Sequence, residues 1–311
     1  MESPLILVTG ADGLVGRYVT RLLSQFHRVV AISRHGAFTR EDGIHSINVD
    51  LGVALEVQRI ADIRPDLIVH LAAALPVGPN DAAVASVNQL IDLHIFNLAK
   101  IADASVVFCS SVSVYENQPG PWLESLPLNP ASAYALSKLQ SERLFSDLAA
   151  GSASLRISSP YGATHLWRSG VLFHFARLSV AGKQLTICGD GNRTQDFVHA
   201  IDVAWAVAQV VESWNRREGL LARGVVNIAS GVPVSMSELA LLILDLTRNS
   251  HPLIFERSGE DEEQYRSQVS IALAASLKNW KPQISLRDGV EHLLEVLDGR
   301  NEDWFAVRRS W

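Results

Sequence analysis

The chain has 311 residues, of which 48% are hydrophobic, and its formal net charge is −6. This length is enough for one large domain or two closely packed ones, and an acidic chain without a basic stripe argues against a nucleic-acid partner. Its two cysteines, Cys109 and Cys188, have no metal-ligand or redox spacing, so we expect no metal site and a cytoplasmic, reducing compartment. No stretch approaches the roughly 20 apolar residues of a membrane span, so we expect no membrane partner.

The first half of the chain alternates short apolar runs with helical patterns. Strands are predicted at Leu5–Thr9, Val29–Ile32, a run ending at Asp50, Leu67–Leu71 and Val106–Cys109, and helices after the first strand and at Val53–Asp62 and Val84–Ala102. The alternation predicts an α/β fold of the doubly wound Rossmann type, with a parallel sheet covered by helices on both faces. Such sheets bind ligands at the carboxyl ends of their strands, where the strand order reverses.

The second half is less regular. Helices are predicted at Ala133–Ala149, Gly170–Ala181, Ala200–Trp214 and Ser235–Thr247, and a strand at Ser154–Ile157. We expect residues 1–162 to form a dinucleotide-binding domain to which residues 195–230 return. Residues 163–194 and 231–311 are expected to form a smaller α/β portion that binds the substrate.

Three glycines, Gly10, Gly13 and Gly16, follow the first predicted strand and open the first predicted helix. Glycine lets backbone amides approach a pyrophosphate closely, and the N–H groups at a helix start attract its negative charge. An ordinary strand–helix turn is the alternative, but this context favours a dinucleotide site. We predict cofactor contacts at Gly10, Gly13, Leu14 and Val15.

The second predicted strand ends in Ser33 and Arg34 rather than in the carboxylate that usually holds the ribose hydroxyls of NAD. Arg34 can pair with a 2′-phosphate and Ser33 can add a hydrogen bond, so the sequence favours NADP over NAD. A solvated role for Arg34 stays open. Asp50 is predicted either to accept a hydrogen bond from the adenine amino group or to cap the helix after it.

A tyrosine and a lysine, Tyr134 and Lys138, lie one helical turn apart on one face of a predicted helix. A free tyrosine has a pKa of about 10, and a nearby ammonium lowers that pKa, so the phenol can exchange a proton while hydride moves to or from a nicotinamide. Lys138 is also expected to bind the nicotinamide ribose. Ser111 ends the preceding strand and is predicted to hold the reacting oxygen beside Tyr134. A surface pair and a strand-end cap are the alternatives.

Together these motifs resemble the extended short-chain dehydrogenase/reductase family, the NAD-dependent epimerase/dehydratase group that modifies nucleotide sugars. Further matching segments are Asp50-Leu51, His70-Leu71-Ala72-Ala73, Ser110 to Tyr115, Leu155 to Gly162, Gly182 to Thr186, Gly189 to Gly191, Asp196 to His199 and Trp280-Lys281-Pro282. The resemblance covers essentially the whole chain. It implies cofactor contacts at Asp50, Leu51, Leu71, Ala72, Ala73, Ser110 and Ile157, besides Tyr134 and Lys138. It also implies a nucleotide-sugar substrate, no metal, and a homodimer through the helices Val84–Ala102 and Ala133–Ala149.

Several positions depart from the family's pattern and narrow the activity. Val112 and Ser113 replace the acid pair of 4,6-dehydratases, and Ser113 and Gly170 replace the cysteine and histidine with which related epimerases shuttle protons. Ser159 and Gln195 replace an asparagine and an arginine that usually contact the substrate, and Arg193 is a substitute for the latter. We therefore expect substrate contacts from Ser111, Ser113, Ser159, Arg193 and Gln195. Cys109 is expected to be a core thiol.

The favoured prediction is a nucleotide-sugar 4-keto reductase that uses NADPH, with Ser111, Tyr134 and Lys138 as its catalytic residues. Three alternatives stay open: a 4-epimerase that retains its NAD, a reductase of a non-sugar ketone, and a non-catalytic NADP-binding sensor. Reductase and epimerase share the same triad chemistry, so the sequence does not separate them. A sensor has no need of the triad, which argues against that alternative.

Overall fold

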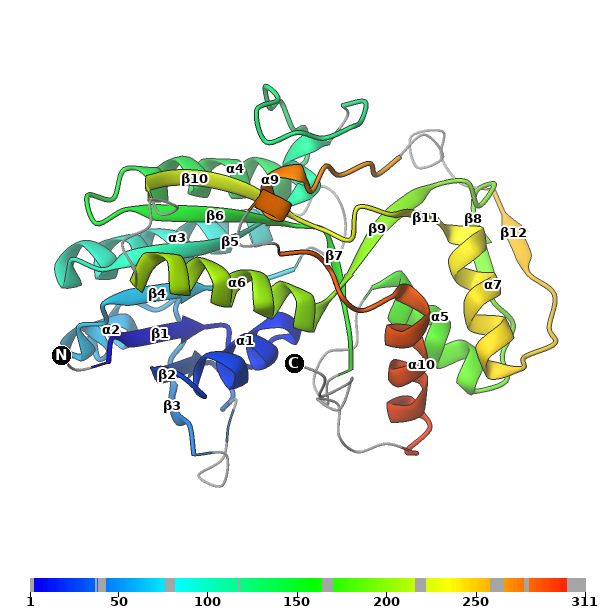
Figure 1. Ribbon diagram of the computed structural model, residues 1–311, viewed down its shortest axis with the longest axis horizontal. Helices are drawn as coiled ribbons and strands as arrows, with labels where there is room; N and C mark the ends of the chain where they lie inside the picture. Colours follow the sequence, from blue (N-terminus) through cyan, green and yellow to red (C-terminus); the bar gives the residue numbers. More distant parts are fainter. Residues whose placement is uncertain are drawn as a thin grey trace.

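The computed structural model describes residues 3–36, 38, 43–75, 82–116, 118–163, 170–215, 222–257, 266–276 and 280–300. Its centre is a seven-stranded parallel sheet in the order β10-β6-β5-β4-β1-β2-β3 (Figure 1). The strands are β1 (Leu5–Thr9), β2 (Arg28–Ser33), β3 (His45–Asn48), β4 (Leu67–His70), β5 (Ser105–Ser111), β6 (Ser152–Ile157) and β10 (Ala222–Ile228). The strand order reverses between β1 and β4, which confirms the predicted doubly wound α/β fold.

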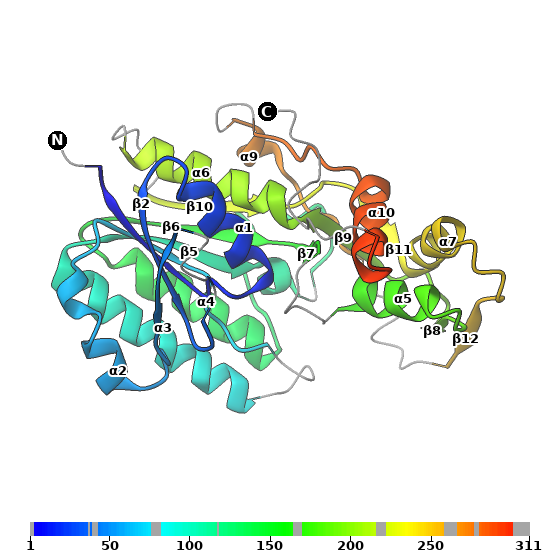
Figure 2. The same ribbon diagram turned by 90° about the horizontal axis from the view of Figure 1, so that it is seen from below.

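Helices cover both faces of the sheet, as Figures 1 and 2 show. One face carries α1 (Leu14–Leu23) and α6 (Ala200–Asn215), and the other carries α2 (Ala54–Gln58), α3 (Ala82–Ala102) and α4 (Ala133–Ser146). Successive side chains of β1 point to opposite faces of the sheet. Ile6 and Val8 join the core around α1 and α6, and Leu7 joins the core around α3. Burial on both faces explains why the strands are continuous apolar runs in the sequence.

A smaller portion of the chain lies beyond the carboxyl edge of the sheet, on the right in Figure 1. It contains α5 (Val171–Val180), α7 (Met236–Thr247), α10 (Leu286–Leu297) and a pair of strands, β8 (Thr186–Cys188) and β12 (Ile254–Glu256). A three-stranded sheet of β7 (Ser159–Tyr161), β9 (Thr194–His199) and β11 (Pro233–Ser235) connects it to the central sheet. Because β7 follows β6 directly and β9 leads into α6, the two portions share a continuous core.

Some predicted boundaries differ from the structure. The helix predicted at Val53–Asp62 divides into α2 and a 3-10 turn at Ala61–Ile63, and the third strand ends at Asn48, before Asp50. The strands β9 and β10 and the helix α10 were not predicted. Strand β9 begins with the polar residues Thr194, Gln195 and Asp196, so it lacks the apolar run or alternation that indicates a strand.

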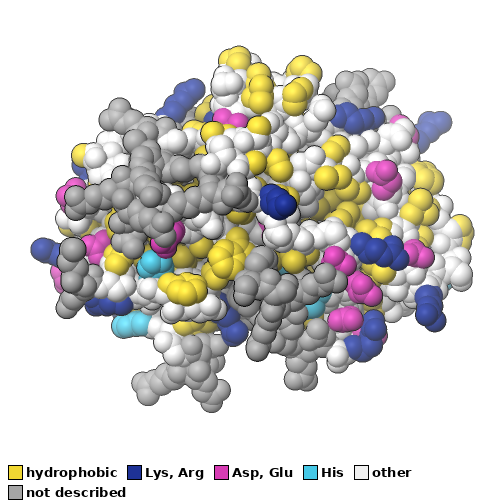
Figure 3. All heavy atoms as spheres, in the orientation of Figure 1, with side chains coloured by type: hydrophobic (Ala, Val, Ile, Leu, Met, Phe, Trp, Pro, Cys, Tyr) yellow, Lys and Arg dark blue, Asp and Glu magenta, His cyan; other side chains and the backbone are white. Residues whose placement is uncertain are grey.

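Within the described ranges, no helix has the length and apolar character needed to cross a bilayer. On the face shown in Figure 3, the coloured Lys and Arg side chains are interspersed with Asp and Glu rather than gathered into a stripe.

Candidate active site

A cavity of about 1080 Å³ lies along the carboxyl edge of the parallel sheet, between the sheet and the smaller portion. Its walls bring together nearly all the residues that the sequence predicted for cofactor, catalysis and substrate. These are Gly10, Gly13, Leu14, Val15, Ser33, Arg34, Asp50, Leu51, Leu71, Ala72, Ala73, Ser110, Ser111, Tyr134, Lys138, Ile157, Ser159, Arg193 and Gln195. Ser113 is the one predicted site residue that the described walls do not include.

The glycine turn can form only because its glycines lack side chains. Gly10 has a φ of +65°, and a Cβ there would lie 2.7 Å from the backbone N of Ala72. A Cβ on Gly16 would lie 2.0 Å from the carbonyl oxygen of Gly10. The turn therefore brings the start of α1 and the loop after β4 within close reach of each other. This is a cradle in which backbone amides can contact a pyrophosphate.

The end of β2 forms the part of the cavity where the ribose of a dinucleotide is expected. Ser33 is 3% exposed, and its Oγ has no hydrogen-bond partner among the described residues. A buried hydroxyl without a partner costs about 1–3 kcal/mol, so a ligand oxygen or phosphate at this point fits the site. Arg34 is exposed beside it at the cavity wall. These residues and the glycine cradle fit a nicotinamide dinucleotide.

Asp50 stabilises a turn in the neighbouring part of the cavity wall. Its Oδ1 accepts a hydrogen bond of 2.8 Å from the backbone N of Gly52. The residue that caps α2 is Val53, and no side chain caps that helix. The prediction that Asp50 caps the following helix is therefore wrong, because the chain makes a further turn before the helix begins. Asp50 lies in the cavity wall, and its contact with the adenine stays a prediction.

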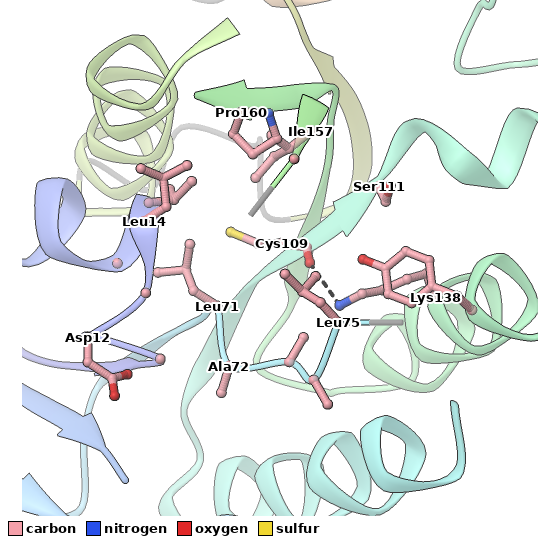
Figure 4. Close-up of a pocket in the computed structure, with 18 of the residues that line it drawn as sticks. Asp12, Leu14, Leu71, Ala72, Leu75, Cys109, Ser111, Lys138, Ile157 and Pro160 are labelled. Carbon is pink, nitrogen blue, oxygen red and sulfur yellow. Dashed lines mark hydrogen bonds between the residues drawn. The ribbon is translucent and has the colours of Figure 1, made fainter. Parts of the chain in front are cut away.

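Tyr134 and Lys138 lie in the first turns of α4, which begins after the cap residue Ser132. Lys138 is buried, and its Nζ donates to the carbonyl oxygen of Cys109 over 3.3 Å (Figure 4). The same Nζ lies 4.7 Å from the ring centroid of Phe108 and 6.0 Å from that of Tyr134. The ammonium is thus held between β5 and the tyrosine, where its charge can stabilise a phenolate.

Ser111 is the last residue of β5 and has two roles. The backbone N of Ser113 donates to the Oγ of Ser111 over 3.1 Å, so Ser111 caps the 3-10 turn η3 (Val112–Tyr115). Its side chain also lines the cavity near Lys138, as Figure 4 shows. Because the oxygen accepts the backbone hydrogen, its own hydrogen can be donated to an oxygen in the cavity.

Ser113, for which a substrate contact was predicted, is not among the described residues of the cavity wall. It follows Ser111 by two residues, within the turn η3, and its Oγ is buried without a hydrogen-bond partner among the described residues. The reason is that the chain leaves the extended conformation directly after Ser111, so the alternation of the strand does not continue to Ser113.

Cys109 was expected to be a core thiol, and it is buried and belongs to the core, but it also lines the cavity. Burial raises its pKa to about 12, although the Lys138 charge acts in the opposite direction. The group is therefore a neutral thiol at neutral pH, with little nucleophilic character.

A buried ion pair beneath the cavity was missed by the sequence analysis. Arg156 of β6 binds Glu142 of α4 through two hydrogen bonds of 2.7 and 3.0 Å, and Ser110 donates to the same carboxylate over 2.6 Å. Arg156 also donates to the hydroxyl of Tyr115 over 2.8 Å. The pair fixes α4 against the ends of β5 and β6. Its sequence signal is an arginine within a strand that is otherwise apolar and small, because such a charge requires a partner.

The side of the cavity where the sequence predicts substrate contacts is formed by side chains from separate segments. Ser159 lies on β7, Gln195 on β9, and Arg193 directly before β9. Apolar side chains complete this wall: Val171, Leu172 and Phe173 of α5, Phe197 of β9 and Leu293 of α10. Among the described residues of this wall, Arg193 supplies the positive charge.

Comparison with known proteins shows the family to which the chain belongs. A sequence profile of the NAD-dependent epimerase/dehydratase family matches residues 6–229. The chain belongs to this family. A UDP-glucose 4-epimerase of Mycolicibacterium smegmatis is 30% identical over 95% of this chain and 99% of its own length. A putative UDP-glucose 4-epimerase of Methanocaldococcus jannaschii is 28% identical over 96% of this chain and 99% of its own length.

Solved structures of UDP-glucose 4-epimerases share the fold. The UDP-glucose 4-epimerase of Thermotoga maritima, solved with UDP-glucose, has a TM-score of 0.83 at 21% identity and covers 95% of this chain and 98% of its own. The UDP-glucose 4-epimerase of Thermus thermophilus, solved with NAD, also has a TM-score of 0.83, at 23% identity, covering 96% of this chain and 100% of its own. The protein is thus an enzyme of the short-chain dehydrogenase/reductase type that belongs among nucleotide-sugar modifying enzymes.

Proposed function

We propose that this protein is a nucleotide-sugar 4-epimerase. The observation that carries the proposal is that Ser111, Tyr134 and Lys138 line one cavity together with the glycine turn. Support for an epimerase rather than the keto reductase favoured by the sequence comes from the relatives, two of which are named as UDP-glucose 4-epimerases and match nearly end to end.

The residues of the triad divide the chemistry between them. When bound, the nicotinamide supplies a site that takes a hydride from C4 of the sugar and returns it. Lys138 stabilises the phenolate form of Tyr134, and this phenolate accepts the proton of the C4 hydroxyl as the carbonyl forms. Ser111 donates a hydrogen bond to the reacting oxygen. After the keto sugar has presented its other face, Tyr134 returns the proton to the oxygen as the alcohol forms again, so no net oxidation would occur.

The substrate wall suggests how the rest of the molecule is held. The guanidinium of Arg193 can bind the diphosphate through charge-assisted hydrogen bonds, and Gln195 and Ser159 can add neutral ones. The apolar residues of α5 and α10 then close around the base or the sugar. These residues support a nucleoside diphosphate sugar as the ligand of the same cavity.

A second proposal concerns the cofactor. Ser33 presents a buried hydroxyl without a described partner, and the exposed guanidinium of Arg34 lies next to it. Neither group repels a 2′-phosphate, whereas the carboxylate usual in NAD enzymes would. We infer a preference for NADP, although the structural neighbours named above include one solved with NAD.

The NADPH-dependent 4-keto reductase stays as a second candidate, and the pair Ser33–Arg34 is the observation that favours it. The two candidates differ in their use of cofactor. An epimerase converts a UDP-hexose into its C4 epimer without net change in nicotinamide absorbance. A reductase consumes NADPH in proportion to a 4-keto nucleotide sugar and forms no epimer. Following absorbance and product composition in one reaction separates them, and stoichiometric NADPH loss would overturn the epimerase proposal.

A homodimer through α3 and α4 is the third part of the proposal. Apolar side chains project from these packed helices into solvent, among them Leu93 at 44% and Leu136 at 40% exposure. Leu93→Glu should yield a monomer by light scattering, because a dimer interface would bury the charge. Leu241→Glu on α7, where the leucine is also exposed, is the matched control and should leave the mass unchanged. A wild-type monomer would contradict this part.

A further inference from the structure

The turn that Ser111 caps is linked by hydrogen bonds to the start of helix α4. Glu116 ends this turn, η3, and its backbone N donates to the carbonyl oxygen of Ser113 over 3.0 Å. Its side chain reaches the helix, where Oε2 accepts from the backbone N of Ala131 over 3.0 Å and from that of Ser132 over 2.7 Å. One carboxylate therefore joins the turn after Ser111 to the residue that caps α4.

The turn η3 is anchored by its own buried side chains. Val114 and Tyr115 are fully buried, and they share a core cluster with Leu139 of α4. The hydroxyl of Tyr115 also donates to the side-chain oxygen of Asn227 over 2.8 Å. The turn is thus packed against the middle of α4 and tied to β10, which gives the Glu116 side chain a fixed base.

The first turn of α4 depends on its caps, because the first N–H groups of a helix have no partner within it. Ser132 supplies one cap, since its Oγ accepts from the backbone N of Ala135 over 3.3 Å. In a capping box, the third helical residue is a Glu or Gln that accepts from the N–H of the cap residue in return. Here that residue is Ala135, which has no acceptor in its side chain. Glu116 supplies the missing acceptor from outside the helix.

We propose that Glu116 is a positioning residue that sets the place of the Tyr134 hydroxyl relative to Ser111. Tyr134 is the second residue of α4 and is half-buried, so a change in how the helix begins moves its ring directly. The two hydrogen bonds carry the effect, so an uncharged acceptor of the same length serves equally well. The inference rests on the proposed proton transfer by Tyr134.

Three substitutions of Glu116 separate the reach of the side chain from its charge. Glu116→Gln keeps an acceptor oxygen at the same distance along the side chain but removes the charge. Glu116→Asp keeps the charge but is shorter by one methylene, and Glu116→Ala removes both features. Glu238→Ala is the matched control, because Glu238 accepts from the backbone N of Ser235 over 2.8 Å at the start of α7, whose described residues are not in the cavity wall.

Turnover of the full chain is measured at a temperature at which every variant is folded by circular dichroism. We expect Glu116→Ala and Glu116→Asp to lower kcat about 10- to 100-fold, because misplacement of a reacting group has costs of this size. Cofactor affinity should stay nearly unchanged. Glu116→Gln and Glu238→Ala should keep kcat near the wild-type value, although Glu238→Ala lowers the melting temperature through its lost cap. Wild-type kcat in folded Glu116→Ala, or equal losses in Glu116→Gln and Glu116→Asp, would overturn the proposal.

A second measurement does not require turnover. The chain has five tyrosines, so protein made with 3-fluorotyrosine gives a simple fluorine NMR spectrum in which Tyr134→Phe assigns the Tyr134 signal. This signal should shift or broaden in Glu116→Ala and stay in place in Glu116→Gln and Glu238→Ala. If Glu116→Ala does not fold, Glu116→Asp carries the same expectation. An inactive wild type would refute the proposed epimerase function alone, whereas an unchanged Tyr134 signal in both shortened variants would overturn the positioning role.

Discussion

The cofactor end and the substrate end of the cavity are built in different ways. The cofactor end uses backbone: a glycine turn that a Cβ would fill, and Thr9 tied to the amides of Leu71 and Ala72. The substrate end uses side chains from β7, β9, α5 and α10, which are distant in sequence. A backbone cradle contacts a ligand through groups that every residue carries, whereas separate side chains can change one at a time. Specificity is therefore expected to reside at the substrate end.

The largest expected effect is on kcat, and it comes from substitution of Tyr134. Tyr134→Phe removes the proton-transfer group, so we expect kcat to fall about 10²–10⁴-fold. Affinity for the cofactor should stay nearly unchanged, because the ring and its packing remain. Turnover measurements paired with cofactor titration by fluorescence check this, and retained activity would rule out the assigned role of Tyr134.

The backbone cradle can be broken with a single methyl group. In Gly16→Ala the new Cβ would meet the carbonyl oxygen of Gly10 at 2.0 Å, so the turn must move. We expect cofactor binding to weaken by about 3 kcal/mol, at the upper end of the cost of overpacking. Gly182→Ala is the control, because Gly182 has a φ of +63° but no atoms within 4 Å of its added Cβ. It should lower stability slightly and leave binding intact; equal binding losses would show that the effect is not local.

The preference for NADP over NAD tests whether the Arg34 side chain contributes to binding at the cofactor end of the cavity. Arg34→Ala should weaken NADP binding by about 1.5–3 kcal/mol if charge-assisted hydrogen bonds form with the 2′-phosphate. NAD binding should change little, since NAD lacks that group. Calorimetric titration with both cofactors measures the difference, and equal losses would refute the NADP preference.

The smallest effect is expected at the substrate end. Arg193→Ala should raise KM for a nucleoside diphosphate sugar by about 10-fold, equivalent to about 1.4 kcal/mol, while cofactor affinity and kcat change little. Steady-state kinetics separate the effect on KM from the effect on kcat. A fall in kcat with unchanged KM would place Arg193 in the chemical step and not in binding.

The difference between the two ends also explains what the sequence can predict. The glycine turn and the Tyr134–Lys138 pair are local motifs whose spacing fixes their geometry, so they could be placed without coordinates. The substrate wall depends on β9, whose polar residues give no strand pattern and whose partners β7 and β11 are remote in the chain. Ser113 lies in a 3-10 turn, where the alternation of β5 has ended, and is not in the described cavity wall.

The sequence of α3 contains a sign that Asp92 is buried and paired, which the sequence analysis did not use. The buried stripe of α3 contains Ile91, Ile95 and Leu98, and the polar residues Asn88 and Asp92 lie on it one turn apart. A polar residue on an apolar helix face requires a partner in the core. The identity of that partner, His70, follows from the packing of α3 on the end of β4, which the sequence does not specify.

The central claim is that hydride leaves C4 of a nucleotide sugar and returns to the same carbon without leaving the enzyme. The most direct test uses a UDP-hexose labelled with deuterium at C4, incubated with the enzyme and an excess of unlabelled cofactor, with products analysed by mass spectrometry and NMR. The account predicts a C4 epimer that retains its deuterium. Loss of the label to free cofactor, or accumulation of a keto sugar without epimer, would contradict it.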